Sequence, residues 1–371
     1  MDDRRYSARN SRPARGGWPS AIVFVLIMSL VGAVFLGYRG DLPRWAVPSG
    51  YTSSTLFGPP LAPLDAAAVA AAVEPELVNI NVSIRPSGMG AAGSGIVLSA
   101  DGEILTSHHV VKGAEKISVG DLGNGSHYPA TVLGYDSDED IALLSLTGAG
   151  ALPVARIGSS AGVQIGDQIL AIGNAGGTGS PTATPGAVTA LDASIVARDT
   201  ADLSRKALIG MIEVAAPVAS GQSGGALVDR TGAVIGVVTA ASGEVARSEG
   251  HASGYAVPID RALNVVRQIR TGIPTDTVHI GPTATLGVLT SDAQPSGARV
   301  DVAVYGMPAF AAGVNAGEVI VSVDGRQVTS AQTLKAALNV RRPDDVVNLD
   351  LIEPDGTRRS LEVTLSAGPP N

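Results

Sequence analysis

The chain has 371 residues, 45% of them hydrophobic and 4% aromatic, with a net charge of -8 at pH 7. This composition favours a β-rich globular protein of two or three domains over a disordered one, and the negative charge argues against a nucleic-acid binder. Cysteine is absent, which excludes disulfide bonds, thiolate nucleophiles and cysteine metal sites.

Residues 16–38 form an uncharged, mostly apolar segment. As a helix it would span about 34 Å, enough to cross a hydrocarbon core of about 30 Å. Positive charge precedes it at Arg4, Arg5, Arg9, Arg12 and Arg15, and only Arg39 and Arg44 follow closely. We therefore expect residues 1–15 to be a cytoplasmic tail and residues 16–38 a single transmembrane anchor in the plasma (inner) membrane, with the remaining chain extracytoplasmic.

A cleaved signal peptide is the alternative interpretation of residues 16–38. The apolar core is longer than the usual stretch of about 7–15 residues, and no A-x-A-like cleavage site follows it. The pattern therefore favours an uncleaved anchor.

Residues 39–64 are rich in proline, glycine and serine and are predicted to be a linker. From residue 65 to residue 273, short β-rich runs alternate with turn signals such as Asp-Gly at 101–102. Helices are expected over Asp65–Val73 and Ile259–Ile269. Because the strands do not alternate with helices, the pattern favours an all-β barrel or sandwich.

Residues 274–366 are predicted to be a smaller domain of short strands with one clear helix over Ser330–Val340. The turn formers in RTGIPTDT, at 270–277, indicate the domain boundary. Residues 367–371 are expected to be a tail.

Ser223 lies between glycines in the segment SGQSGGALVD, residues 220–229. Such a serine can be a tight turn or a catalytic nucleophile, and G-Q-S-G-G also fits the G-x-S-x-G elbow of an α/β-hydrolase. That elbow requires a helix after the serine, whereas residues 226–238 have the pattern of a β-hairpin. The hairpin argues against the α/β-hydrolase fold.

Four segments of the chain are GSGIVLSADGEILTSHHVV, GYDSDEDIALLSL, QIGDQILAIGN and GQSGGALVDRTGAVIGVV. Their order and spacing resemble the HtrA/Deg family of trypsin-like serine proteases. The resemblance extends over about residues 70–365. It implies a mainly β fold, with a trypsin-like double β-barrel followed by a PDZ domain.

The resemblance implies a catalytic triad of His109, Asp140 and Ser223. His109 corresponds to the family's histidine, and Asp140 directly precedes an apolar β-run. Two adjacent residues at a strand end point to opposite faces, so His108 is expected to be a packed or solvent-facing neighbour. Solvated turn positions are expected for the two nearby acids, Asp136 and Asp138.

The oxyanion hole is expected to use the backbone amides of Gly221 and Ser223, with the amide of Gln222 assisting. The chain departs from the family pattern here, because Gln222 replaces the usual Asn or Asp and Ala226 replaces a proline. The segment IEVAAPVASG, residues 212–221, is also unusual. These departures leave open whether the oxyanion hole is formed at rest.

The substrate pocket is expected to be lined by Val218, Val237, Val238, Thr239 and Ala240. These side chains are small and mostly apolar, and no acid is available to pair with a substrate lysine or arginine. We therefore expect cleavage after small or medium aliphatic residues.

In the last domain, Leu286, Gly287 and Val288 resemble the carboxylate-binding turn and strand of a PDZ domain. A peptide C-terminus would pair with this strand by β-augmentation. Leu334 and Leu338 are expected to line the other side of the groove, with plain core packing as the alternative for each.

The resemblance implies a membrane-anchored serine endopeptidase that cleaves misfolded or regulatory envelope proteins through an acyl-enzyme, without metal or cofactor. Expected partners are polypeptide substrates, peptide C-termini at the PDZ domain, lipid around residues 16–38, and further copies of the chain in a homotrimer, but no nucleic acid. The alternative is a non-catalytic chaperone or binding scaffold with a silent protease fold. Native substrates and activation by PDZ ligands stay open.

Overall fold

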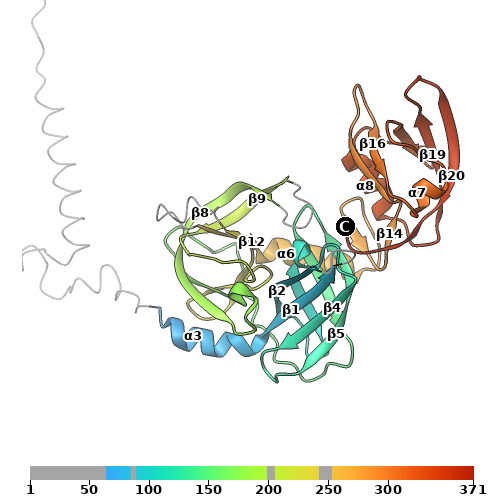
Figure 1. The fold of residues 1–371 in the computed structure, drawn as a ribbon. Helices are drawn as coiled ribbons and strands as arrows, with labels where there is room; N and C mark the ends of the chain where they lie inside the picture. The colour runs from blue at the N-terminus through green and yellow to red at the C-terminus, as the bar shows by residue number, and fades with distance from the viewer. Residues whose placement is uncertain (1–63, 85–88, 199–204, 242–252) are drawn as a thin grey trace, which may run out of the picture. The chain divides into compact units, whose positions relative to one another are not determined.

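The computed structural model describes residues 64–84, 89–198, 205–241 and 253–371. The predicted cytoplasmic tail, the transmembrane anchor and all but the last residue of the linker lie outside these ranges. Across the part of the chain that the structure describes, no helix is both long enough and apolar enough to span a membrane. The strands form two β-barrels and a smaller β-sheet domain (Figure 1).

The first barrel is built from antiparallel strands in the order β5-β4-β1-β2-β3-β6, and a pairing of β5 with β6 closes it. Its strands are β1 (Leu77–Ile84), β2 (Met89–Val97), β3 (Glu103–Ser107), β4 (Lys116–Asp121), β5 (His127–Asp136) and β6 (Ile141–Leu146). Aliphatic side chains such as Ile80, Val119 and Leu144 fill its interior. Because successive residues of a strand point to opposite faces, one face of each strand covers this core.

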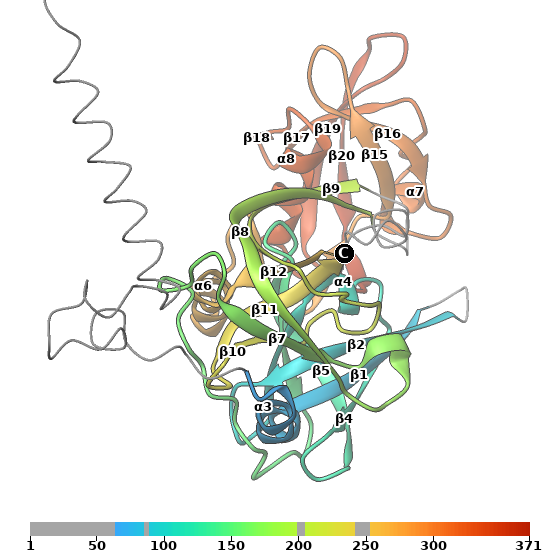
Figure 2. The same ribbon diagram turned by 90° about the vertical axis from the view of Figure 1, so that its left-hand side faces the viewer.

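The second barrel is closed by strands in the order β10-β11-β12-β9-β8-β7, drawn in green and yellow in Figure 2. Its strands are β7 (Gln168–Gly173), β8 (Thr182–Arg198), β9 (Arg205–Val214), β10 (Ala226–Asp229), β11 (Val234–Ala241) and β12 (Gly254–Pro258). The predicted hairpin after Ser223 is β10 and β11, and a helix does not follow the serine. The double β-barrel expected from the sequence is therefore present.

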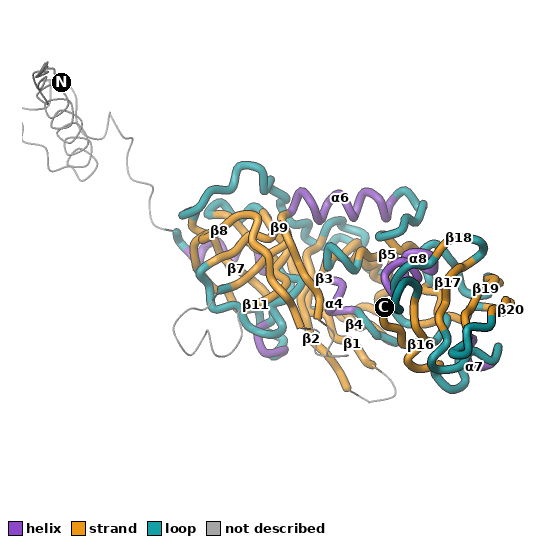
Figure 3. Tube along the Cα trace, turned by 90° about the horizontal axis from the view of Figure 1, so that it is seen from above, coloured by secondary structure: helices purple, strands orange, loops and turns teal. Residues whose placement is uncertain are grey.

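Two predicted helices pack on the barrels. Helix α3 (Ala66–Val73) begins at Asp65, whose carboxylate caps the N–H of Ala68 at 3.0 Å. Helix α6 (Ile259–Arg270) places apolar residues at helical spacing and buries them against strands of both barrels (Figure 3). A single core cluster accordingly contains residues of the first barrel, such as Leu143, and of the second, such as Leu170.

The third sheet has the strand order β15-β16-β17-β19-β20, with β18 paired to β17, and its own core. Its elements are β15 (Val288–Asp292), β16 (Ala298–Ala303), α7 (Pro308–Ala311), β17 (Val319–Val323), β18 (Arg326–Gln327), α8 (Ala331–Asn339), β19 (Val346–Ile352) and β20 (Arg358–Thr364). Helix α8 matches the predicted helix and begins with a capping box at Ser330.

Two short strands differ from the predicted domain limits. Strand β13 (Val278–Ile280) pairs with β5 of the first barrel, although its residues were assigned to the last domain. Strand β21 (Ser366–Gly368) pairs with β14 (Thr283–Thr285), so the predicted tail begins inside a strand. Both are three-residue strands whose pairing depends on distant segments, which local pattern does not reveal.

Candidate active site

Two hydrogen bonds hold His109 on Asp140. Strand β3 ends at Ser107 and the short helix α4 (His108–Val111) follows directly, so that His109 lies in its first turn. The Nδ1 atom of His109 lies 2.8 Å from Asp140 Oδ2, and its backbone N–H donates to Asp140 Oδ1 at 3.0 Å. Because the acid holds Nδ1, Nε2 is the ring nitrogen directed away from the carboxylate, which is the arrangement of a histidine general base.

Asp140 is a buried carboxylate with a third hydrogen bond, donated to its Oδ2 by the hydroxyl of Thr239. Burial alone would raise the pKa of Asp140. The charge of His109 and the hydrogen bonds from His109 and Thr239 outweigh burial and hold the pKa below its ordinary value. Thr239 was assigned to the pocket wall. Its role at the acid was missed, and the only signal in the sequence was a hydroxyl on the strand after the nucleophile.

The turn before Asp140 is organised by Asp136. Asp136 Oδ1 accepts the backbone N–H groups of Asp138 at 2.8 Å and Glu139 at 3.1 Å, and Asp140 then adopts a φ of 56°. Asp136 is only 4% exposed, and burial raises its pKa. The expectation that it is solvated was therefore wrong, whereas Asp138 is exposed as expected.

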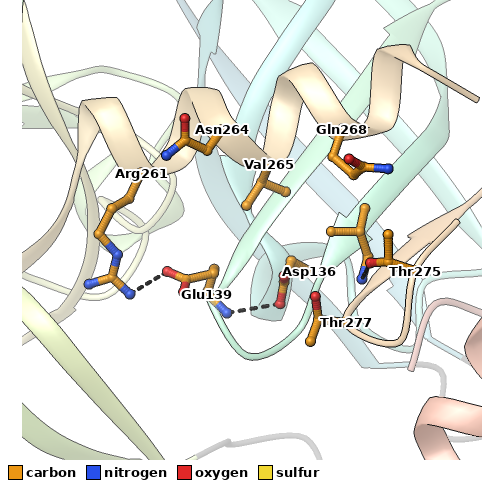
Figure 4. A pocket seen from close by; sticks show the side chains of 9 residues that line it. Asp136, Glu139, Arg261, Asn264, Val265, Gln268, Thr275 and Thr277 are labelled. Carbon is orange, nitrogen blue, oxygen red and sulfur yellow. Dashed lines mark hydrogen bonds and ion pairs between the residues drawn. The ribbon is translucent and has the colours of Figure 1, made fainter. Parts of the chain in front are cut away.

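A cleft of about 320 Å³ separates this turn from helix α6 (Figure 4). Arg261 reaches from α6 to the carboxylate of Glu139 and also donates to the carbonyl of Gly210 on β9. The cleft is lined by Asp136, Glu139, Arg261, Asn264, Val265, Gln268, Thr275, Thr277 and Val278. These contacts tie the turn that carries Asp140 to the helix packed on both barrels.

Ser223 lies at the end of the segment that precedes β10. Its Oγ donates to the carbonyl of Thr239 at 3.3 Å, and its own carbonyl accepts the N–H of Ser94 on β2 at 2.8 Å. Thr239 thus contacts Asp140 through its hydroxyl and Ser223 through its carbonyl. Two predicted triad residues, Asp140 and Ser223, therefore both contact Thr239. The third, His109, contacts Asp140.

The turn Ala219–Gln222, called here the oxyanion turn, is closed by a hydrogen bond from the N–H of Gln222 to the carbonyl of Ala219 at 3.1 Å. Gly221 has a φ of 92°, as the third residue of a type II turn requires. The carbonyl of Ser220 accepts the N–H of Gly176 at 2.7 Å. In a planar trans peptide the N–H of Gly221 points the opposite way, away from Gly176.

This geometry bears on two expectations about the oxyanion hole. The Gly221 N–H points away from the loop that carries Gly176, so it is not directed at that loop. The Gln222 N–H is already bonded to Ala219, so the prediction that it assists in the hole was wrong.

A side chain at Gly221 would not fit. A Cβ atom there would lie 2.1 Å from the carbonyl oxygen of Asn174 and 3.0 Å from the amide nitrogen of Gly177. The Gly221 carbonyl accepts the hydroxyl of Ser94 at 2.8 Å, and that hydroxyl accepts the N–H of Asn174 at the same distance. Ser94 therefore connects the oxyanion turn to the loop after β7.

His108 was expected at a strand end, pointing away from His109, and only its backbone conformation differs from that expectation. It begins helix α4 rather than ending a strand, but successive helical residues also point in different directions, so it diverges from His109. Its ring is buried and stacks on Tyr135 at a centroid distance of 4.6 Å. Burial lowers the pKa of His108 to about 3, so this ring is neutral at physiological pH.

Comparisons with known proteins agree with this geometry. A family model described as a trypsin-like peptidase domain matches residues 93–237, and a PDZ domain model matches residues 284–365. The chain is 33% identical to serine protease PepD of Mycobacterium tuberculosis, over 80% of this chain and 65% of that protein. It is 31% identical to the putative serine protease HhoA of Synechocystis sp., over 74% of this chain and 69% of that protein. The chain belongs to the HtrA family.

The chain spans only part of several HtrA relatives. It covers 56% of a probable periplasmic serine endoprotease, DegP-like, of Pseudomonas fluorescens, at 31% identity over 75% of this chain. Among solved structures it is similar to the HtrA-type protease AlgW with decapeptide, at 25% identity over 83% of this chain and 100% of that one, with a TM-score of 0.47.

Burial does not support the predicted pocket wall of this HtrA chain, because Val218 is only 3% exposed and lies in the same core cluster as Val238. Val218 packs against Gly254, where an added Cβ would lie 2.4 Å from its Cγ2 atom. Val237 and Val238 are fully buried in the barrel cores, so they do not line an open pocket as predicted. The side chain of Ala240 lies outside the described residues.

In the PDZ domain, Gly287 has a φ of 77°, and a Cβ there would lie 2.1 Å from that of Met307. Val288 begins strand β15, which lies at the end of the sheet order and pairs with β16 on one side. Leu286 and Leu334 are buried in the domain core, and Leu338 is partly buried against it. The glycine turn and the strand edge fit a peptide site, while core packing accounts for the leucines.

Proposed function

We propose that the chain is a serine endopeptidase whose catalytic residues are His109, Asp140 and Ser223. The observation that carries this proposal is the pair of hydrogen bonds between His109 and Asp140, with Thr239 bridging that acid to the serine. The N–H of Gly221, which points away from Gly176, supports it further.

In the proposed reaction, Ser223 Oγ attacks the carbonyl carbon of the scissile peptide bond while His109 Nε2 takes the serine proton. The N–H groups of Gly221 and Ser223 donate to the oxyanion of the tetrahedral intermediate. His109 then gives its proton to the leaving amine, and an acyl-enzyme remains on Ser223. Water, deprotonated by His109, attacks the ester, and the collapse of the second intermediate returns the proton to Ser223.

Substrates are proposed to be misfolded or regulatory envelope proteins, cleaved after small or medium aliphatic residues. The small, mostly apolar residue types in the segments around Ser223, with no acid among them to pair with a substrate lysine or arginine, support this preference. The free edge of β15 in the described part of the sheet supports binding of peptide C-termini at Gly287 and Val288.

The proposed location is the extracytoplasmic side of the plasma membrane, with residues 16–38 as an uncleaved anchor and the protein assembled as a homotrimer. The apolar run and the arginines before it support the anchor. After alkaline carbonate extraction, the full chain should stay in the membrane fraction, and a variant lacking residues 1–38 should not. Light scattering of that shortened variant should give three times the chain mass.

The catalytic proposal is tested with casein and a fluorophosphonate probe. Wild type should cleave casein and label at Ser223, whereas Ser223→Ala and His109→Ala should do neither and should keep wild-type circular dichroism. Ser126→Ala, at an exposed position in the turn between β4 and β5, is the matched control and should stay active. Cleavage by a purified Ser223→Ala variant would refute the assignment.

The silent scaffold was the alternative because the segment before Ser223 is unusual. Against this alternative, the positive φ of Gly221 is compatible with a formed hole, and His109 lies within hydrogen-bond distance of Asp140. Nothing in the described residues favours the silent scaffold.

A further inference from the structure

The side chain of Gln222 is completely buried, although glutamine is a polar residue that is mostly exposed in proteins. Its Oε1 atom accepts the backbone N–H of Ala219 at 2.8 Å. Its Nε2 atom donates to the carbonyl of Thr182 at 3.0 Å and the hydroxyl of Thr184 at 3.2 Å, with the carbonyl of Ala171 at 3.4 Å. Both ends of the carboxamide are therefore satisfied inside the protein.

Both polar backbone groups of Ala219 are bonded to Gln222. The Ala219 N–H donates to the side chain of Gln222, and the Ala219 carbonyl accepts its backbone N–H. Since Ala219 is the first and Gln222 the last residue of the oxyanion turn, these bonds tie its two ends together. Gly221, between them, is thereby held at its positive φ.

The other end of the carboxamide is anchored in the second barrel. Thr182 and Thr184 lie on β8, where they pair with Gly173 and Ala171 of β7. Because strands in a closed barrel move little, this anchor places the turn relative to a rigid element. Gln222 therefore links the oxyanion turn to β7 and β8.

We propose that Gln222 is a positioning residue whose buried carboxamide holds the oxyanion turn in the conformation that aims the Gly221 N–H at the substrate carbonyl. This inference rests on the proposed function, because it concerns the same site. The sequence suggested that the backbone N–H of Gln222 donates to the oxyanion. The proposal instead assigns the Gln222 side chain a role in positioning the turn.

The site needs an acceptor and a donor on one planar group. Ala219 presents an N–H and Thr182 presents a carbonyl, and a carboxamide satisfies both. A protonated carboxyl group also offers one acceptor and one donor, whereas an ionised carboxylate only accepts and would face two carbonyl oxygens. Within the described residues, the Gln222 side chain bonds to main-chain groups and a threonine hydroxyl, none of which titrates.

The test is Gln222→Glu, which keeps the shape and makes donation depend on pH. Burial should raise the pKa of the new carboxyl above the ordinary value of about 4.3. The ratio of variant to wild-type kcat/KM, measured on a fluorogenic peptide, should lie within about threefold of one at pH 5 and fall at least about 10-fold by pH 8.5. Protonation of His109 affects both enzymes and cancels in the ratio.

The matched control is Gln168→Glu, the same charge change at an exposed position of β7, whose ratio should not vary with pH. A second variant, Gln222→Met, keeps the length and removes the hydrogen bonds. It should lose about 10-fold or more in kcat at every pH, with KM within about threefold of wild type.

A constant ratio for a folded Gln222→Glu, or wild-type kcat in Gln222→Met, would overturn the proposal. If Gln222→Glu fails to fold, Gln222→Met decides. If wild type itself fails to cleave, or Ser223→Ala cleaves equally well, the proposed function falls instead, so the two failures are distinguishable.

Discussion

Replacing Gly221 by alanine tests the oxyanion turn most directly. The added Cβ would lie 2.1 Å from the carbonyl oxygen of Asn174 and 3.0 Å from the amide nitrogen of Gly177. A normal contact is about 3.5 Å, so either the turn or the Asn174 backbone must move by more than about 1 Å. The φ of 92° adds about 1–2 kcal/mol of strain for a residue with a Cβ.

The turn can relieve both penalties by flipping the peptide between Ser220 and residue 221. The flip breaks the hydrogen bond from Gly176 to Ser220 and turns the N–H of residue 221 away from the substrate. Loss of one oxyanion donor costs about 10²–10³ in kcat, or about 2.7–4 kcal/mol. We expect that loss in kcat with KM changed by less than about threefold, since the donor acts mainly in the transition state.

The assay is steady-state hydrolysis of a fluorogenic peptide, combined with thermal unfolding. Gly150→Ala is the control, because Gly150 is exposed and a Cβ there meets nothing within 4 Å. Its kcat should equal that of wild type. A folded Gly221→Ala variant with kcat within threefold of wild type would refute the assigned geometry of the turn.

Three further predictions concern single side chains. Thr239→Val removes the donor to the catalytic carboxylate, worth about 1.5–3 kcal/mol, so kcat/KM should fall about 10-fold or more; an unchanged value would contradict this role. Val218→Ala removes methyl groups from a buried contact with Gly254, so the free energy of unfolding should fall by about 1.5 kcal/mol or more, and an unchanged value in denaturant titrations would contradict this packing. Because burial lowers the pKa of His108 to about 3, the unfolded chain binds this proton first as the pH falls below about 6.5. The free energy of unfolding should then decrease by about 1.4 kcal/mol per pH unit towards pH 3. His108→Phe, which can still stack on Tyr135, should weaken that dependence in denaturant titrations, and equal slopes would contradict the argument.

The elements with strong local patterns could be predicted from the sequence. Helix α6 carries apolar residues at helical spacing, and the residues of β10 and β11 read as a hairpin around an Asp-Arg-Thr-Gly turn. The closure of the barrels could not be read in this way. Closure depends on strand pairings such as β5 with β6 and β12 with β9. The short strand β13 likewise pairs with β5, which lies about 140 residues before it in the chain.

At the site, the sequence identified residue types but not all their contacts. Asp136 and Asp138 are chemically identical and two residues apart, yet one is buried and the other exposed, because only the turn geometry distinguishes them. For the same reason Gln222 was interpreted through its backbone, while its side chain makes the decisive contacts. Such roles depend on which distant groups meet the side chain in the folded protein.

The proposed catalytic groups come from both barrels, so their alignment depends on hydrogen bonds that cross between the barrels. His109 and Asp140 belong to the first barrel, and Ser223 and Thr239 to the second. Thr239 crosses to Asp140, and the N–H of Ser94 on β2 crosses to the carbonyl of Ser223 at 2.8 Å. Since the core beneath them is also shared, the barrels are fixed to each other where the chemistry occurs. A change in their relative position would therefore disturb the acid–base pair, the nucleophile and the oxyanion turn together rather than one at a time.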